Sequence, residues 1–422
     1  MKLSLRNIGK IDEATVEIDG ITIIAGENNT GKSTVGRALF SVFNSFCGID
    51  GKIKLERIKS VEGIIDLTYR NITDKIILTF DTEDIARNIV ERSSLFKNDV
   101  SLIRDEVAQS IMQYDESFEK YADSMDMREL AVRIQELLNV PDENIFKSVL
   151  EKKLTVEFNG QVSNIYSEVS GEICLQIKDK AMAITVEEND VTDITGIVNL
   201  RTEVVYLDDP LVLDGPQYPF MRHGPNYIDH RTDIEDKLLY HQKKTNVVEE
   251  LAVNHKFQKI YDKIATVCSG EIVKNKPSGF DYKRKNSDKT LDVRNLSTGM
   301  KTFAILKVLL QNGTIDYNGT IVLDEPEIHL HPEWQLLFAE LIVLLHKEFK
   351  MHILLNTHSP YFLRAIQVYS AKYEVADRCK YYLAEAAGDY AHIFDVTDDV
   401  EKIYVKLSRP LQRLEDERWQ DD

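Results

Sequence analysis

The sequence has 422 residues, 43% of them hydrophobic and 29% charged, which predicts a globular protein of two or three parts with a sizeable core. Its 70 acidic and 52 basic residues give a formal net charge of −18, which argues against broad non-specific coating of DNA but leaves room for a local basic groove. No run of eighteen apolar residues and no signal-peptide core occur, and the 4 cysteines form no C-x-x-C pair. We therefore expect a cytoplasmic protein with reduced thiols and no membrane partner.

A phosphate-binding loop is the first motif along the chain. Residues 21–25 are apolar and mostly β-branched, which predicts a short buried strand, and Val35, Ala38 and Leu39 begin a helical repeat further on. Between them stands Gly26-Glu-Asn-Asn-Thr-Gly-Lys-Ser33, which fits the G-x-x-x-x-G-K-[ST] pattern. Its glycines allow the backbone N–H groups to form an anion nest at a helix N-terminus. We expect Lys32 to reach the β- and γ-phosphates and the Ser33 hydroxyl to bind Mg²⁺. The alternative is an ordinary glycine-rich turn, which would not require a strand before it and a helix after it.

The region after the loop is expected to hold a helical insert. Strands of the first lobe should continue to about Phe80, and the pattern then turns helical to about Lys152. A heptad-like seam of fewer than three repeats lies within it, formed by Val107, Ile111, Tyr114, Phe118, Tyr121 and Met125. The seam is too short for a long coiled-coil arm. It fits either a compact insert that packs on its own lobe or a knob that docks a partner.

Strand character returns at 154–209, and helices are expected at 233–240 and 247–267. A basic cluster follows, which fits a solvated hairpin or a nucleic-acid contact: Lys274, Lys276, Lys283, Arg284 and Lys285. These patterns divide the chain into a first lobe at 1–81 and 153–215, a helical insert at 82–152, a helical and hairpin insert at 216–290, and a second lobe at 291–422.

A serine-bearing helix start comes next, at Leu296-Ser-Thr-Gly-Met-Lys301, followed by Phe303, Leu306 and Leu310 at helical spacing. A hydroxyl, backbone N–H groups and the helix dipole would all face one anion there. By itself the motif is explained equally well as a plain helix cap.

An acid pair follows the next predicted strand, at 320–323. Because ligands of an open parallel sheet gather beyond the carboxyl ends of its strands, Asp324 would lie near Ser33 and hold Mg²⁺, directly or through water. Glu325 would point elsewhere and polarise the attacking water of a phosphoryl transfer. The apolar run before the pair argues against a solvated acidic turn.

Histidines after the acid pair allow two interpretations. The two in Glu327-Ile-His-Leu-His-Pro332 are disfavoured as metal ligands, because residues two apart do not share a helix face. The helical repeat after Pro332 instead predicts a loop that leads into a helix. His358 follows a third predicted strand at 352–356, where an imidazole would bond the γ-phosphate or the attacking water. A lone histidine is usually structural, and only its place in the series of motifs favours the functional role.

Taken in this order, the motifs resemble the ABC-type ATPase head, in the branch that includes RecF, SMC-like proteins and the OLD-family ATPases. The run Asp324-Glu-Pro-Glu-Ile-His-Leu-His-Pro332 and Asn28-Asn29-Thr30 look particularly like the OLD-type and defence-associated AAA family ATPases. The resemblance implies an α/β P-loop NTPase fold, a two-lobed head with a mixed β-sheet and helical insertions. It implies ATP and Mg²⁺ as cofactors.

The resemblance also implies residue roles. Glu325 would be the catalytic glutamate, His358 the switch histidine and Lys32 a third catalytic residue. Ser33 and Asp324 would hold Mg²⁺. The residues implied to contact ATP are Gly26, Asn28, Asn29, Thr30, Gly31, Lys32, Ser33 and Thr34, with Ser297 and Gly299 reaching the γ-phosphate of ATP held by a second subunit. Thr298 and Met300 replace the commonest glycine and glutamine of that signature, and no Q-loop glutamine can be placed.

The implied function is a switch that forms a homodimer, or a higher even oligomer, around ATP. OLD-type relatives often carry a C-terminal TOPRIM nuclease, but no Asp-x-Asp pair follows Glu385, so no TOPRIM domain is expected. A separate effector, a nuclease or toxin of anti-phage defence, is then the expected partner. The alternative is a RecF- or SMC-like DNA repair or recombination ATPase, which keeps nucleic acid open as a partner.

Overall fold

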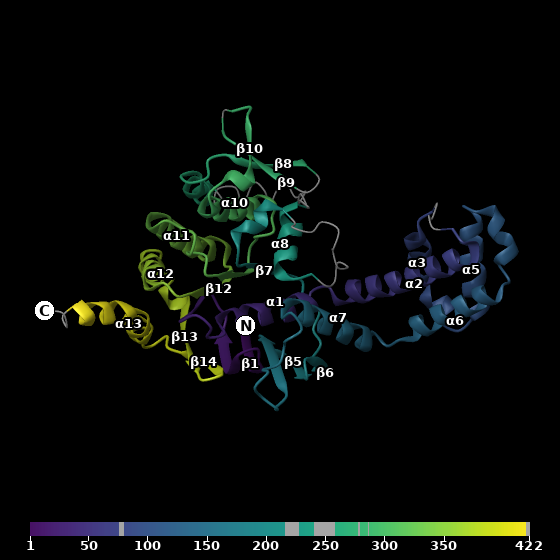
Figure 1. Ribbon diagram of the computed structural model, residues 1–422, viewed down its shortest axis with the longest axis horizontal. Coiled ribbons are helices and arrows are strands. Elements are labelled where there is room, and N and C mark those ends of the chain that lie inside the picture. The colour runs from purple at the N-terminus through teal and green to yellow at the C-terminus, as the bar shows by residue number, and fades with distance from the viewer. Residues whose placement is uncertain (76–79, 216–227, 240–257, 277–278, 286, 419–422) are drawn as a thin grey trace. The chain divides into compact units, whose positions relative to one another are not determined.

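The computed structural model describes residues 1–75, 80–215, 228–239, 258–276, 279–285 and 287–418 (Figure 1). They form two compact units. The smaller is Gly48–Val149, and the larger combines Met1–Cys47 with Leu150–Asp422. In the described part of the chain, no helix combines the length and the apolar character that crossing a membrane requires.

The smaller unit is helical. Its elements are α2 (Ile49–Thr73), α3 (Thr82–Glu91), α4 (Ser93–Phe96), α5 (Val100–Met112), the 3-10 helix η1 (Glu116–Tyr121), α6 (Met125–Asn139) and the start of α7 (Asp142–Glu157). The expectation that strands continue to Phe80 is wrong, and the helical unit begins at Gly48 instead of 82. The physical reason is visible in α2, where Ile58, Val61 and Ile65 recur at helical spacing and are buried in the core of this unit.

The expected heptad-like seam is also wrong as a continuous stripe. Val107, Ile111 and Phe118 are buried, but Tyr114 and Met125 are 59% and 75% exposed. The reason is that η1 and two turns interrupt the helical path between α5 and α6, so the residues do not share one helix face.

The larger unit is built on one mixed sheet in the order β6-β5-β4-β1-β2-β14-β13-β3-β12-β11-β7. Its strands are β1 (Lys2–Ile8), β2 (Ile11–Glu17), β3 (Ile21–Gly26), β4 (Gly171–Ile177), β5 (Lys180–Glu187), β6 (Asp190–Thr195), β7 (Val204–Leu207), β11 (Thr320–Asp324), β12 (His352–Thr357), β13 (Cys379–Ala387) and β14 (Tyr390–Asp395). The run β13-β3-β12-β11-β7 is parallel, whereas β6 to β2 are antiparallel. Strands from both expected lobes therefore alternate in a single sheet.

Helices cover both faces of the parallel strands, because alternate strand residues point to opposite sides. The helices of this unit are α1 (Lys32–Phe46), the 3-10 helix η2 (Pro210–Asp214), α8 (His230–Leu239), a helix at 258–265, the 3-10 helix η3 (Val293–Asn295), α10 (Thr298–Gln311), α11 (Pro332–Phe349), α12 (Pro360–Lys372), the 3-10 helix η4 (Ala376–Arg378) and α13 (Glu401–Arg418). Ile23, Leu323 and Leu355 face a core shared with α10, α11 and α12. On the other face, Gly36 of α1 lies so close to Val322 and Tyr206 that a side chain there would collide with them.

The described part of 216–290 shares the core of the larger unit. Ile234 of α8 and Ile260 of the 258–265 helix are buried with the residues of α10 and α11. A small antiparallel sheet, β10-β9-β8, follows, with β8 (Glu271–Lys276), β9 (Gly279–Lys283) and β10 (Thr290–Asp292). The helix expected at 247–267 lies outside the described residues up to 257. At the end of β9, Lys283, Arg284 and Lys285 are exposed.

Candidate functional site

The phosphate loop joins β3 to α1, as predicted. All six residues of β3 are buried, and α1 begins at Lys32 with Gly31 as its N-cap. Gly31 has φ of 77°, a left-handed conformation that glycine adopts without strain. At Gly26 the need for glycine is steric, because a Cβ atom would lie 2.3 Å from the backbone oxygen of Ala384 on β13. The backbone can therefore turn its N–H groups toward an anion only with glycine at both positions.

Lys32 lies within the loop. Its side chain is 3% exposed, and its Nζ donates hydrogen bonds to the backbone oxygens of Gly26 (3.0 Å) and Glu27 (2.7 Å). Burial lowers the pKa of Lys32, and the negative charges of Glu325 and Asp324 oppose that shift. Thr30 is buried as well and donates its hydroxyl to the Glu27 oxygen at 2.8 Å. The loop thus holds a cation on its inner side, where an anion would neutralise it.

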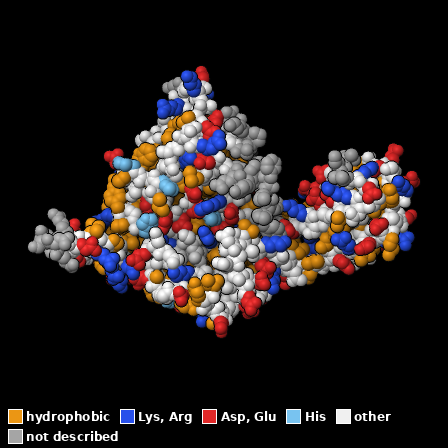
Figure 2. Space-filling view, in the orientation of Figure 1, with side chains coloured by type: hydrophobic (Ala, Val, Ile, Leu, Met, Phe, Trp, Pro, Cys, Tyr) orange, Lys and Arg blue, Asp and Glu red, His pale blue; other side chains and the backbone are white. Residues whose placement is uncertain are grey.

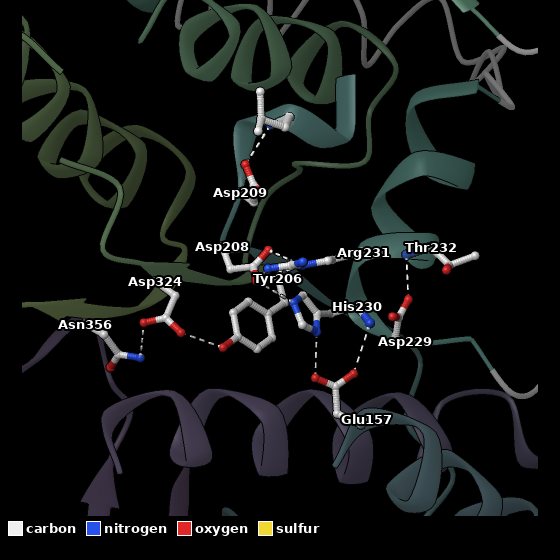
Figure 3. Close-up of polar contacts among 11 residues, drawn as sticks. Glu157, Tyr206, Asp208, Asp209, Asp229, His230, Arg231, Thr232, Asp324 and Asn356 are labelled. Carbon is white, nitrogen blue, oxygen red and sulfur yellow. Dashed lines mark hydrogen bonds and ion pairs between the residues drawn. The ribbon is translucent and has the colours of Figure 1, made fainter. Parts of the chain in front are cut away.

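Asp324 ends β11 beside this loop. Its side chain accepts a hydrogen bond from Tyr206 Oη to Oδ2 (2.7 Å) and another from Asn356 Nδ2 to Oδ1 (2.9 Å) (Figure 3). Asp324 is 7% exposed, its two hydrogen-bond donors are neutral, and the cation whose charge interacts with it is Lys32. The Asp324 carboxylate and the Ser33 hydroxyl are the hard oxygen donors that Mg²⁺ prefers. The residues present therefore fit a magnesium ion.

Glu325 and His358 meet next to Lys32. Glu325 has φ of 49°, and its N–H donates to the Asn356 oxygen at 2.9 Å, so the backbone turns sharply after Asp324. Its Oε1 lies 3.1 Å from His358 Nδ1 and 3.6 Å from Lys32 Nζ. The two acids thus have different partners: Asp324 accepts hydrogen bonds from Tyr206 and Asn356, and Glu325 lies beside Lys32 and His358. A carboxylate beside a lysine and an imidazole is suited to orienting water near a phosphate.

A cavity of about 280 Å³ opens over the loop. Its lining residues are Lys10, Asn28, Asn29, Thr30, Gly31, Lys32, Ser33, Thr34 and Glu325. Figure 2 shows acidic and basic side chains gathered near α1 and β7 on the face in view. Lys10 was missed by sequence reasoning. It stands in the turn between β1 and β2, and no motif marks it; only the β1–β2 hairpin brings it to the loop.

The signature residues are not among the lining residues of this cavity. Ser297 is the exposed N-cap of α10, and its side chain makes no capping hydrogen bond. Gly299 is buried against the next segment of the chain, where a Cβ atom would lie 2.7 Å from the His329 oxygen. Packing within the chain therefore accounts for this glycine, while the Ser297 hydroxyl has no role in capping its own helix.

Glu327 was also missed as part of the site. It is 2% exposed, its Oε1 accepts a hydrogen bond from the Thr357 hydroxyl, and its Oε2 has no partner among the described groups. Burial raises the pKa of Glu327, while the Thr357 hydrogen bond opposes the rise. The contact links the acid-pair segment to the residue before His358. Its signal in the sequence is the second glutamate of Asp324-Glu-Pro-Glu327.

The segment 327–331 is a loop that leads into α11, as predicted. His331 is the N-cap of α11 and accepts a hydrogen bond from the Glu333 N–H, as a loop leading into a helix requires. His329 is exposed. In the ranges that the structure describes, no three His, Cys, Asp or Glu side chains come together in a metal-binding group.

A buried histidine lies behind Asp324. His230 Nδ1 lies 2.6 Å from Glu157 Oε1, and its Nε2 forms an ion pair with Asp208 Oδ2 at 3.1 Å (Figure 3). Burial alone would lower the pKa of His230, but hydrogen bonds with Asp208 and Glu157 outweigh it and raise the pKa to about 9. Burial would raise the pKa of Asp208, yet His230 and Arg231 hold it at about 2. The imidazole is therefore charged at neutral pH.

This histidine makes the stability of the fold depend on pH. Since its folded pKa of about 9 lies above the ordinary value of 6.5, its contribution is complete below about pH 6.5 and is lost as pH rises through 9. The loss amounts to about 3 kcal/mol. In urea unfolding at several pH values, we expect the stability difference between wild type and His230→Gln to shrink by this amount from pH 6 to pH 9. A difference that stays constant over this range would contradict the assignment.

The parallel strands, the phosphate loop and the acid pair define a P-loop ATPase with an α/β fold and a mixed sheet. The chain belongs to the AAA ATPase domain family, whose model matches residues 1–363.

Two curated relatives are similar over part of the chain. The Septu protein PtuA of Bacillus thuringiensis is 29% identical in an alignment of 217 positions that covers 43% of this chain and 52% of PtuA. The retron Ec83 probable ATPase of Escherichia coli is 28% identical in an alignment of 196 positions that covers 42% of this chain and 34% of that protein. The match thus spans about half and about a third of these relatives.

Solved SMC heads are more distant. The SMC head domain from Thermotoga maritima has 13% identity and a TM-score of 0.38, covering 94% of this chain and 98% of that one. An SMC head bound to the C-winged helix domain of ScpA has 13% identity and a TM-score of 0.43, covering 93% and 96%. Scores this low add nothing to the assignment, which rests on the family match and the site.

Proposed function

We propose that this protein binds and hydrolyses ATP with Mg²⁺ and acts as a switch, in which two copies close around ATP and reopen after hydrolysis. The observation that carries the proposal is the meeting of Lys32, Glu325 and His358 over one phosphate loop. Lys32 would neutralise the β- and γ-phosphates, and backbone N–H groups of residues 28–34 would hold their oxygens.

The remaining residues take the roles that their positions allow. Ser33 and Asp324 would hold Mg²⁺, which when bound neutralises charge on the phosphates. Glu325 would accept a hydrogen bond from the attacking water and so draw a proton of that water away from the γ-phosphate. His358, 3.1 Å from Glu325, would orient that carboxylate or donate to the γ-phosphate.

A second subunit would complete the site. The Ser297 hydroxyl is exposed at the N-terminus of α10, where the N–H groups and the helix dipole favour an anion. Ser297 is not among the lining residues of the cavity over the phosphate loop, and we assign its hydroxyl to the γ-phosphate held by another copy. The isologous arrangement gives two such sites in a dimer.

The proposed biological role is control of a separate effector, a nuclease or toxin, in anti-phage defence in the cytoplasm. Its support is the resemblance to defence-associated ATPases and the likeness to the Septu and retron proteins. The alternative is a DNA repair ATPase, favoured only by the exposed basic residues Lys283, Arg284 and Lys285. ATPase activity that rises sharply with DNA, and DNA binding that weakens steeply with salt, would select the alternative.

A complementation experiment tests the shared site. Lys32→Ala and Ser297→Ala should each be inactive as a pure protein, because every site then lacks one component. Mixed in equal amounts, half of the dimers contain both variants, and each of these has one intact site of two. The mixture should recover about a quarter of wild-type ATPase activity if subunits exchange freely.

The matched control mixes Lys32→Ala with Ser33→Ala, whose defects lie on the same side of the site, and should recover nothing. Ser297→Ala should also keep its melting temperature, because the hydroxyl makes no capping bond to lose. Recovery no greater than in the control mixture, or the same oligomeric state with and without ATP·Mg²⁺, would overturn the shared-site proposal.

A further inference from the structure

Tyr206 is a buried residue with a polar contact that no sequence motif explains. It lies on β7, it is 1% exposed, and its hydroxyl donates to Asp324 Oδ2 at 2.7 Å across 118 positions of sequence. Asn356 donates to the other oxygen of the same carboxylate. Each oxygen of Asp324 thus has a neutral donor, and the carboxylate is held in one orientation.

The Tyr206 ring is itself held in place. It stacks on His230 with ring centroids 4.2 Å apart and an angle of 20° between the planes. Phe40 of α1 packs edge-on against both rings, at 6.2 Å from Tyr206 and 6.1 Å from His230. The Tyr206 ring therefore has aromatic partners from α1 and from α8. Figure 3 shows the ring beside His230.

The histidine under the ring is fixed in turn. Its two ring nitrogens lie against Glu157 and Asp208, and its backbone N–H donates to Glu157 Oε2 at 3.0 Å. Arg231 adds hydrogen bonds to Asp208, the shortest at 2.6 Å. A charged, buried network of this kind resists reorientation, because every movement would leave a buried charge without its partner.

We propose that Tyr206 is a positioning residue for metal binding: its hydroxyl, held by the His230 stack, orients Asp324 toward the magnesium that accompanies ATP. The inference rests on the proposed ATP site and deepens it. A carboxylate that is already oriented loses less freedom when a cation binds, so removing the hydroxyl weakens the metal more than the nucleotide.

The test uses Tyr206→Phe in the full chain, with Mn²⁺ as the metal probe. Mn²⁺ affinity is measured by electron paramagnetic resonance in the presence of a non-hydrolysable ATP analogue. We expect it to fall 10- to 100-fold, in the range typical of lost outer-shell partners of metal ligands. Affinity for a fluorescent ATP analogue in EDTA should stay close to that of wild type, which a general loss of structure would not allow.

Tyr69→Phe is the matched control. Tyr69 is also 1% exposed, and its hydroxyl also donates to a carboxylate, Asp115 Oδ2, at 2.7 Å, but it belongs to the helical unit. Tyr69→Phe thus removes the same atom from the same kind of hydrogen bond, but in the unit that holds neither Ser33 nor Asp324. Mn²⁺ affinity should therefore not change. Replacing Tyr206 with para-aminophenylalanine keeps the ring and a donor and should restore most of the affinity, which also covers the case in which Tyr206→Phe does not fold.

The outcomes separate the two proposals. If wild type binds Mn²⁺ with the analogue and Tyr206→Phe binds it equally well, the positioning role is refuted while the ATP site stands. Loss of affinity in the para-aminophenylalanine protein equal to that in Tyr206→Phe would refute it as well. If wild type binds neither the analogue nor Mn²⁺, the proposed function fails and the inference fails with it.

Discussion

Glu325→Gln is expected to lower kcat for ATP hydrolysis by about a hundredfold to a thousandfold while ATP stays bound. Glutamine has the size of glutamate and keeps a carbonyl oxygen near His358 and Lys32, but it cannot draw a proton from water. The distances of 3.1 and 3.6 Å to these two residues place the carboxylate at the loop, where the attacking water of a bound triphosphate would stand. Because hydrolysis reopens the proposed dimer, the variant should accumulate as an ATP-bound dimer.

Single-turnover hydrolysis and light scattering after size-exclusion chromatography measure the two effects. Glu333→Gln is the control: it makes the same chemical change at an exposed position in the first turn of α11 and should leave both unchanged. A Glu325→Gln protein that hydrolyses ATP at the wild-type rate would remove Glu325 from the catalytic role. One that stays monomeric with ATP·Mg²⁺ would instead contradict the switch.

Lys32→Ala is expected to weaken ATP binding by about a hundredfold, since charge-assisted hydrogen bonds to phosphate are among the strongest polar contacts. In the structure the ammonium group is buried, and burial lowers its pKa by disfavouring the charge. A phosphate would supply the opposing charge next to this buried ammonium group. Titration with a fluorescent ATP analogue measures the change directly.

Lys263→Ala provides a comparison lysine. Its Nζ forms an ion pair with Glu340 Oε2 at 2.6 Å on α11, away from the cavity lining. If both variants lose ATP affinity to the same extent, the loss reflects damage to the fold. Unchanged affinity in Lys32→Ala would mean that the loop does not bind phosphate through this side chain.

Local patterns were predicted well where a short stretch of chain builds the feature by itself. The strand before the loop, the helix from Lys32, the strand before Asp324 and the helix from Pro332 all appear in the structure. Periodicity and spacing suffice in such cases because the residues concerned are neighbours in sequence.

Predictions failed where distant packing decides the outcome. The expected strands before Phe80 are the helix α2, whose apolar residues pack in the core of the smaller unit. The seam from Val107 to Met125 is broken by η1, which spacing alone could not reveal. A repeat of apolar residues predicts that these residues are buried. Whether they lie on one helix depends on the turns between the elements.

By itself, the sequence determined the phosphate loop, the acid pair and the order in which these functional residues follow the parallel strands. Each motif is contiguous, and the backbone conformation that it requires is set by residues next to it in the chain. Only the tertiary structure brought Lys10 to the cavity, Tyr206 to Asp324, and His230 between Glu157 and Asp208. The hydrogen bond from Tyr206 to Asp324 spans 118 positions, and no spacing rule connects such residues. Sheet order and helix packing place them together, and most buried polar groups of a folded chain find a hydrogen-bond partner in this way.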